Sequence, residues 1–158
     1  MNSKQKADFG SRLVAFIIDL IIYFLIQILT IAITLPLLEY LSGGVGLNSF
    51  LIFLAVIFLN GLIYFWILIP LMESSRHQGT LGKIAMKLRV TDMSGKKISF
   101  GRAFLRAVCK QLSGLTMMIG YLIALFDPDG QALHDKLANT LVVTKVNEFH
   151  ADFDHASI

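Results

Sequence analysis

The chain has 158 residues, of which 55% are hydrophobic and only 16% charged, with a net charge of +3. This length has room for one domain and a handful of membrane spans, and we treat residues 1–158 as a single domain. The mean hydropathy of +0.67 and the grouping of apolar residues into long runs predict an integral membrane protein. Because the chain has one cysteine, Cys109, it excludes an internal disulfide and a cysteine-rich metal site.

The first apolar run, 13–38, contains a carboxylate, Asp19. A run of about 20 apolar residues crosses a bilayer, and an aspartate inside one costs roughly 2.5–3.5 kcal/mol on insertion scales. Arg12 stands seven residues earlier, which places both charges on one helix face about 10 Å apart along the axis. Charges at such depth pair with each other, line a wet cavity or carry ions and protons.

The polar side chains of this run share one stripe of the expected helix. At 100° per residue they fall within an arc of about 80°. They are Arg12, Asp19, Tyr23, Gln27, Thr30 and Thr34. Such a stripe is either a helix–helix seam held by hydrogen bonds or the wall of a polar pathway. Asn60, in the middle of the second run, is expected to hydrogen-bond to this stripe.

Two further apolar segments follow the first. The run 47–72 is again long enough to span, and a Gly-rich turn at 39–46 joins it to the first run. The third segment, about 107–126, is shorter and contains Ser113-Gly114. It either continues a helix that crosses the bilayer obliquely or dips in and returns at Ser113-Gly114. The expected fold is therefore an all-α membrane protein with two transmembrane helices and a third spanning or re-entrant segment.

Basic residues predict how these runs are oriented. Lys4, Lys6 and Arg12 precede the first run and many more fill the segment 73–106, whereas the turn 39–46 has none. By the positive-inside rule, the N-terminus and the basic segment are cytoplasmic and the turn is external. We therefore expect a multi-pass protein of a cytoplasmic-type cell membrane.

Two short β-branched runs, 87–92 and 140–146, predict a small cytoplasmic β-ribbon. If they pair, the polar tail 127–158 lies on the same side as the basic segment. We favour this arrangement because it also places Asp135 on the side of Arg12.

With these segments laid out, the chain resembles the RDD family of small membrane proteins, named for one arginine and two aspartates. The matching residues are, in chain order, Gly10-Ser11-Arg12-Leu13 with Asp19, Gly79-Thr80-Leu81-Gly82-Lys83, Leu88-Arg89-Val90-Thr91-Asp92, Ser99-Phe100-Gly101-Arg102-Ala103 with Arg106, and Leu133-His134-Asp135-Lys136-Leu137-Ala138-Asn139-Thr140. The resemblance implies that Arg12, Asp19 and Asp135 are the name-giving triad. Asn139 stands where the family commonly has glycine. Transport is the function usually suggested for the family, and some members resemble cation/proton antiporters.

Two functions are compatible with these features. In the first, the protein is a transporter, or a transporter subunit, for small cations coupled to protons. Asp19 would then exchange the ion, with Gln27, Thr30, Thr34 and Asn60 supplying neutral oxygens, the ligands that hard cations favour. Two or three helices are too few to enclose a pathway, so this function requires a homo-oligomer or a larger membrane complex. In the second, the protein is a structural or accessory module in which Arg12, Asp19 and Asp135 form a fixed ion-pair network.

The remaining motifs support simpler roles. The basic row Arg102, Arg106 and Lys110 is suited to anionic lipid headgroups or to setting topology. The segment 79–83 lacks the spacing of a phosphate loop, and the four histidines show no metal-ligand spacing. We therefore expect no enzyme, no cofactor, no metal and no nucleic-acid partner.

Overall fold

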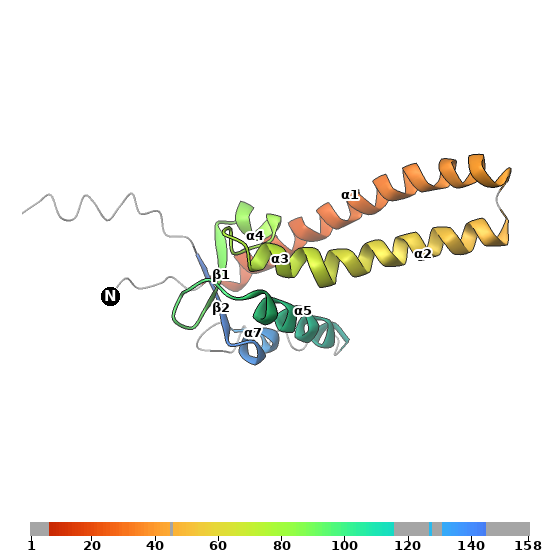
Figure 1. The fold of residues 1–158 in the computed structure, drawn as a ribbon. Helices are drawn as coiled ribbons and strands as arrows, with labels where there is room; N and C mark the ends of the chain where they lie inside the picture. The colour runs from red at the N-terminus through yellow and green to blue at the C-terminus, as the bar shows by residue number, and fades with distance from the viewer. Residues whose placement is uncertain (1–6, 45, 116–126, 128–130, 145–158) are drawn as a thin grey trace, which may run out of the picture.

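The dominant feature of the computed structural model is a long helical hairpin (Figure 1). The structure describes residues 7–44, 46–115, 127 and 131–144. One arm is α1 (Phe9–Ser42), and the other runs without interruption through α2 (Leu47–Ile63), η1 (Tyr64–Leu68) and α3 (Ile69–Glu73). Both arms, of 34 and 27 residues, are long and apolar enough to cross a membrane, which confirms the two predicted long apolar helices.

The ends of the first arm follow ordinary capping chemistry. The side chain of Asp8 accepts hydrogen bonds from the backbone N–H of Ser11 at 3.0 Å and from its hydroxyl at 2.5 Å. At the other end, Gly43 closes the helix with φ +68°, a left-handed conformation that glycine adopts without strain.

The second arm widens into a π-helical turn, η1, just before Pro70. Proline has no N–H to donate, and its ring clashes with the carbonyl four residues earlier, so the α-helical ladder cannot continue unchanged. The N–H of Ile69 donates instead to the carbonyl of Tyr64, five residues back. This local widening directs Tyr64 and Phe65 toward α1, where both rings pack on Tyr23 at centroid distances of 4.9 and 5.0 Å.

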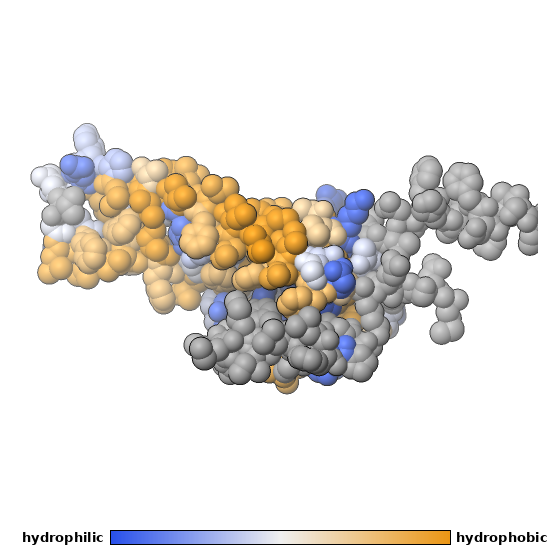
Figure 2. Space-filling view, turned by 180° about the vertical axis from the view of Figure 1, so that it is seen from behind, coloured by the Kyte–Doolittle hydropathy of each residue, from blue (hydrophilic) through white to orange (hydrophobic). Residues whose placement is uncertain are grey.

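Most of the hairpin surface is apolar and exposed. Only 6% of the most apolar window of either arm is buried inside the structure. Figure 2 shows hydrophobic residues covering the hairpin, with hydrophilic residues gathered at its tip and around the opposite end. In water, so large an apolar surface would be costly, whereas hydrocarbon accommodates it without penalty.

A small cap sits at the end of the hairpin that carries the start of α1 (Figure 1). Its elements are α4 (Leu81–Ala85), β1 (Leu88–Asp92), α5 (Phe100–Leu115), α7 (Leu133–Leu137) and β2 (Thr140–Thr144). Helix α4 packs against α1, while α5 packs against α3, η1 and α7. The backbone N–H of Ala7 donates to the carbonyl of Val142 at 3.1 Å, which ties the chain before α1 to the sheet.

The predicted β-ribbon is confirmed as a two-stranded antiparallel sheet. Leu88 pairs with Thr144 and Asp92 with Thr140. One face buries Leu88, Val90 and Val142, which join Ala15, Ile98 and Ala103 in the core of the cap. Just before β2, Asn139 has φ +50°, the left-handed conformation that glycine adopts most easily and asparagine tolerates best among other residues. This explains why asparagine can occupy a position where the family commonly has glycine.

The third predicted membrane segment, 107–126, is only partly described. Its first part belongs to α5, which starts at Phe100 and is described as far as Leu115; residues 116–126 lie outside the described residues. A third membrane span is therefore not confirmed. Within the described part, α5 buries Ala103, Arg106 and Ala107 toward the rest of the protein and exposes Phe100, Phe104 and Leu105.

Close packing of α4 on α1 generates a prediction about Gly82. A Cβ at this position would clash with the carbonyl oxygen of Ala15 and lie 2.9 Å from the carboxyl carbon of Asp19. We expect Gly82→Ala to destabilise the fold by roughly 1–3 kcal/mol, as overpacking does, with a lower midpoint of thermal unfolding in detergent micelles. The matched control is Gly101→Ala in α5, where a Cβ would meet nothing within 4 Å and helix propensity favours alanine by about 1 kcal/mol. Equal unfolding midpoints for the two variants would contradict this packing.

Candidate functional site

Charged side chains meet in an alternating chain where the hairpin joins the cap. Asp135 binds Arg12 at 2.9 Å on one side and Arg106 at 2.7 Å on the other. Arg106 also binds Glu73 at 2.9 Å, and the other oxygen of Glu73 binds Lys83. Three cations thus alternate with two carboxylates, and we call these five residues the junction network. They come from α1, α3, α4, α5 and α7.

Asp135 is the centre of the junction network. It lies in the first turn of α7, has no exposed surface, and also accepts the backbone N–H of Ala132 at 3.2 Å. Burial alone would raise the pKa of this carboxyl, but Arg106 and Arg12 hold it well below its usual range. Burial alone would lower the pKa of Arg106. The facing carboxylates of Asp135 and Glu73 outweigh this effect and raise it. Asp135 therefore stays ionised and paired at any physiological pH.

Glu73 and Lys83 are the members that sequence reasoning missed as site residues. Glu73 is 2% exposed at the end of α3, and Lys83 is buried in α4. Burial, reinforced by Arg106, lowers the pKa of Lys83 to about 8. One sequence signal could have found this pair: Glu73 is the only acidic residue between Glu39 and Asp92, in front of a strongly basic segment.

The side chain of Asp19, on α1, binds the start of α4 and not Arg12. Its two carboxylate oxygens accept the hydroxyl of Thr80 at 2.5 Å and the backbone N–H of Gly82 at 2.7 Å. These donors belong to the N-terminal end of α4, where unpaired N–H groups and the helix dipole favour a negative charge. The hydrogen bonds of Asp19 therefore attach α1 to α4, while Arg12, on the same face of α1, reaches Asp135 and the carbonyl of Val142.

His134, next to Asp135, is buried as well. Burial lowers its pKa to about 3, so the imidazole is neutral under ordinary conditions. Among the described residues, no three histidine, cysteine or acidic side chains come together as a set of metal ligands.

The polar stripe of α1 forms a seam with the second arm over part of its length. Gln27 is buried and donates to the hydroxyl of Tyr23 at 2.6 Å. Asn60 donates to the hydroxyl of Thr30 at 3.0 Å, as the sequence led us to expect, and Thr30 donates in turn to the carbonyl of Ile26 within its own helix. Thr34, one turn beyond Thr30, is half-buried.

The basic row of α5 divides into three different environments. Arg106 is a correction to our lipid-contact prediction: its side chain is 4% exposed and belongs to the junction network. Helix α5 packs against α3 and α7. The charge of Arg106 is therefore neutralised by carboxylates inside the protein and does not reach lipid. Arg102 is exposed and lies 3.9 Å from Asp92. Lys110 is half-buried and lines a cavity.

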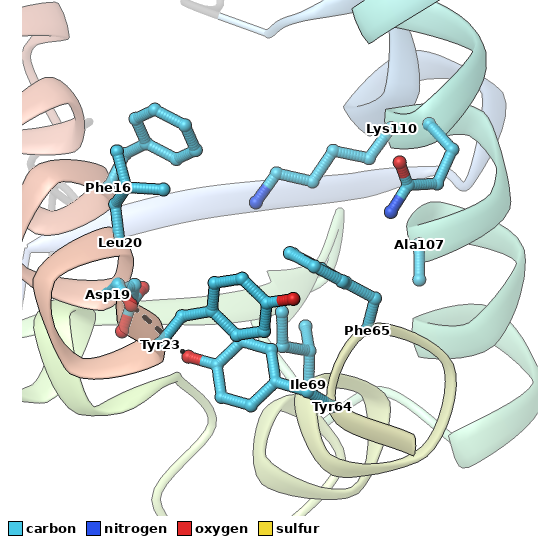
Figure 3. Close-up of a pocket in the computed structure, with 10 residues that line it drawn as sticks. Phe16, Asp19, Leu20, Tyr23, Tyr64, Phe65, Ile69, Ala107 and Lys110 are labelled. Carbon is cyan, nitrogen blue, oxygen red and sulfur yellow. Dashed lines mark hydrogen bonds between the residues drawn. The ribbon is translucent and has the colours of Figure 1, made fainter. Parts of the chain in front are cut away.

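This cavity, of about 220 Å³, lies between α1, η1 and α5 (Figure 3). Aromatic side chains form much of its wall, and Figure 3 shows the side chain of Lys110 reaching across from α5 toward α1. The hydroxyl of Tyr64 donates to the backbone carbonyl of Asp19 at 3.3 Å. The residues that line it are Phe16, Asp19, Leu20, Tyr23, Tyr64, Phe65, Ile69, Ala107, Lys110 and Gln111.

Comparison with known proteins identifies the family. A sequence model of the RDD family matches residues 6–139, most of the chain. The chain belongs to the RDD family. It is also similar to the uncharacterized protein YxaI of Bacillus subtilis (strain 168), with 30% identity over 156 residues, 90% of this chain and 99% of that protein. No solved structure matches. In this RDD protein, the three residues that the resemblance implies as the name-giving triad all lie where the hairpin meets the cap.

The junction network generates a prediction about Asp135. Asp135→Asn removes the charge shared by Arg12 and Arg106 and leaves a buried excess of positive charge, so we expect a loss of about 3–5 kcal/mol in the free energy of unfolding. Asp92→Asn is the matched control, because its ion pair with Arg102 is long and solvent-accessible. Chemical denaturation of both variants in detergent measures the difference. Similar losses for the two would show that the network does not hold the cap on the hairpin.

Proposed function

We propose that this protein is an integral membrane accessory module, in which a fixed ion-pair network locks a small cap onto a two-helix membrane hairpin. One observation carries the proposal: Arg12, Asp19 and Asp135 each bind a partner on a different element, across the boundary between hairpin and cap. The module carries out no chemical step of its own in this proposal and needs no cofactor.

The contacts of these three residues hold separate elements of the fold together. Arg12 joins α1 to α7 and β2, and Asp19 joins α1 to α4. An ion that bound Asp19 would have to compete with the short hydrogen bonds that both of its oxygens already accept. Because breaking a buried charge pair is costly, such a network holds one arrangement of its elements.

We further propose that the hairpin crosses a cytoplasmic-type membrane twice, with the N-terminus and the cap on the cytoplasmic side. The concentration of basic residues before α1 and in the cap supports this orientation. Assembly with further copies or with other membrane proteins would cover part of the exposed hairpin.

Cysteine labelling tests this orientation. In a Cys109→Ser background, a membrane-impermeant maleimide should label Gly46→Cys, in the exposed turn, in intact spheroplasts. Lys136→Cys, whose native side chain is 45% exposed in the cap, should be labelled only after permeabilisation. The Cys109→Ser protein alone provides the background. Labelling of Lys136→Cys in intact spheroplasts would place the cap outside and refute the orientation.

A second candidate function is proton-coupled transport of a small cation. The observation that favours it is that Asp19 lines the cavity beside α5 and lies on the same face of α1 as the polar seam. Since two membrane helices cannot enclose a pathway, transport would require an oligomer.

Reconstituted vesicles distinguish the two functions. With an imposed pH gradient, we expect Na⁺, K⁺ or Li⁺ to cause no proton movement beyond that of protein-free vesicles. We expect Asp19→Asn to lose about 1.5–3 kcal/mol of stability, because its hydrogen bonds to a charged acceptor are weakened, whereas Glu39→Gln at the exposed end of α1 should not. Cation-dependent proton movement that Asp19→Asn abolishes without loss of stability would establish the transporter instead.

A further inference from the structure

Two hollows lie side by side along the hairpin, and Lys110 lines the first of them. The first is the cavity between α1, η1 and α5. The second is an open groove of about 570 Å³ along α2 and η1, lined by Tyr23, Ile57, Phe58, Gly61, Leu62, Phe65, Trp66 and Gln111. Tyr23, Phe65 and Gln111 line both, so the two hollows lie next to each other. Together they give a polar end beside Lys110 and a mostly apolar extension along a membrane-type helix.

Lys110 brings to the polar end a positive charge that has no direct ion-pair partner among the described residues. Its ammonium lies 5.8 Å from the centre of the Phe16 ring, and within the described residues no carboxylate lies within 4.0 Å of it and no hydrogen bond engages it. Burial lowers the pKa of this lysine, so its charged form is held at a cost. An anionic group in the cavity would offset that cost directly.

The other described charged side chains near the cavity are already bound to partners elsewhere, so Lys110 is the one that faces it. Arg106, one turn earlier on α5, is occupied by Asp135 and Glu73. Asp19 also lines the cavity, but both of its oxygens are bound to Thr80 and Gly82 on the side of α4. A cation entering the cavity would meet the Lys110 ammonium at its centre (Figure 3), which disfavours cation binding despite the aromatic walls.

We infer that the cavity and the groove form a binding site for one anionic phospholipid, with its phosphate against the Lys110 ammonium and an acyl chain along the groove. The walls come from both arms of the hairpin, so the site opens at the depth of a membrane and not into bulk water. Basic pockets between membrane helices recognise phospholipid headgroups by this chemistry. A free phosphate would satisfy Lys110 but leave the apolar groove without an occupant. This inference goes beyond the accessory function and holds whether or not the protein transports ions.

Native mass spectrometry of the protein in detergent tests the site, with phosphatidylglycerol titrated against phosphatidylcholine of the same acyl chains. We expect wild-type protein to bind one phosphatidylglycerol in preference to phosphatidylcholine. Lys110→Gln should weaken that binding by about fivefold or more, the factor that corresponds to roughly 1 kcal/mol per basic residue at a membrane surface. Lys110→Arg should retain it, because the positive charge is kept.

Arg102→Gln is the matched control, because it removes an exposed basic residue from the same helix. It should leave phosphatidylglycerol binding unchanged, and thermal unfolding of each variant checks that it is folded. Inorganic phosphate added in excess should not displace the lipid; displacement would point to a phosphate site without lipid specificity. Equal binding of both lipids, or equal losses in Lys110→Gln and Arg102→Gln, would overturn the inference.

Discussion

The neutralisation of Asp135 is the constraint on which the rest of this structure depends. A carboxylate with no exposed surface is tolerated only if cations and hydrogen-bond donors surround it. Here the donors are Arg12 from the hairpin and Arg106 from the cap, together with a backbone N–H of its own helix turn. Because each arginine belongs to a different part of the molecule, satisfying this one charge brings those parts together.

The distribution of polarity differs from that of a water-soluble domain. The hairpin exposes apolar side chains along its length, whereas the junction buries four charges and half-buries a fifth, Arg12. Replacing buried ion pairs by apolar residues is often neutral for stability, so such a network is best understood as specifying one arrangement. Apolar contacts with lipid cannot select how the cap sits on the hairpin, but a chain of alternating charges from five elements can. This is the physical basis of our proposal that the protein is an accessory module.

Helix α5 shows how one element can serve both the junction network and the wall of the cavity. One face carries Arg106 into the network, and the next turn carries Lys110 to the edge of the cavity. Phe104, on another face, packs against Trp66 of η1 at a centroid distance of 5.7 Å. The π-helical turn before Pro70 provides the aromatic rings on the opposite side of the cavity. The cavity is therefore lined by the π-helical turn of one helix and by a lysine of another.

The sequence by itself determined the two long apolar helices, the β-ribbon and the shared polar face of α1, because these follow from run length and periodicity within short segments. It also led to Asp135, but only through resemblance to a family. Tertiary structure alone decided which residues pair. Arg12 and Asp135 are 123 residues apart in the sequence, and Asp19 and Gly82 are 63 apart. The sequence did not predict that Glu73 belongs to the network. Periodicity shows which way a side chain points from its own helix. It carries no information about which distant segment will lie there, and so Arg106 was expected at the lipid surface and is found inside.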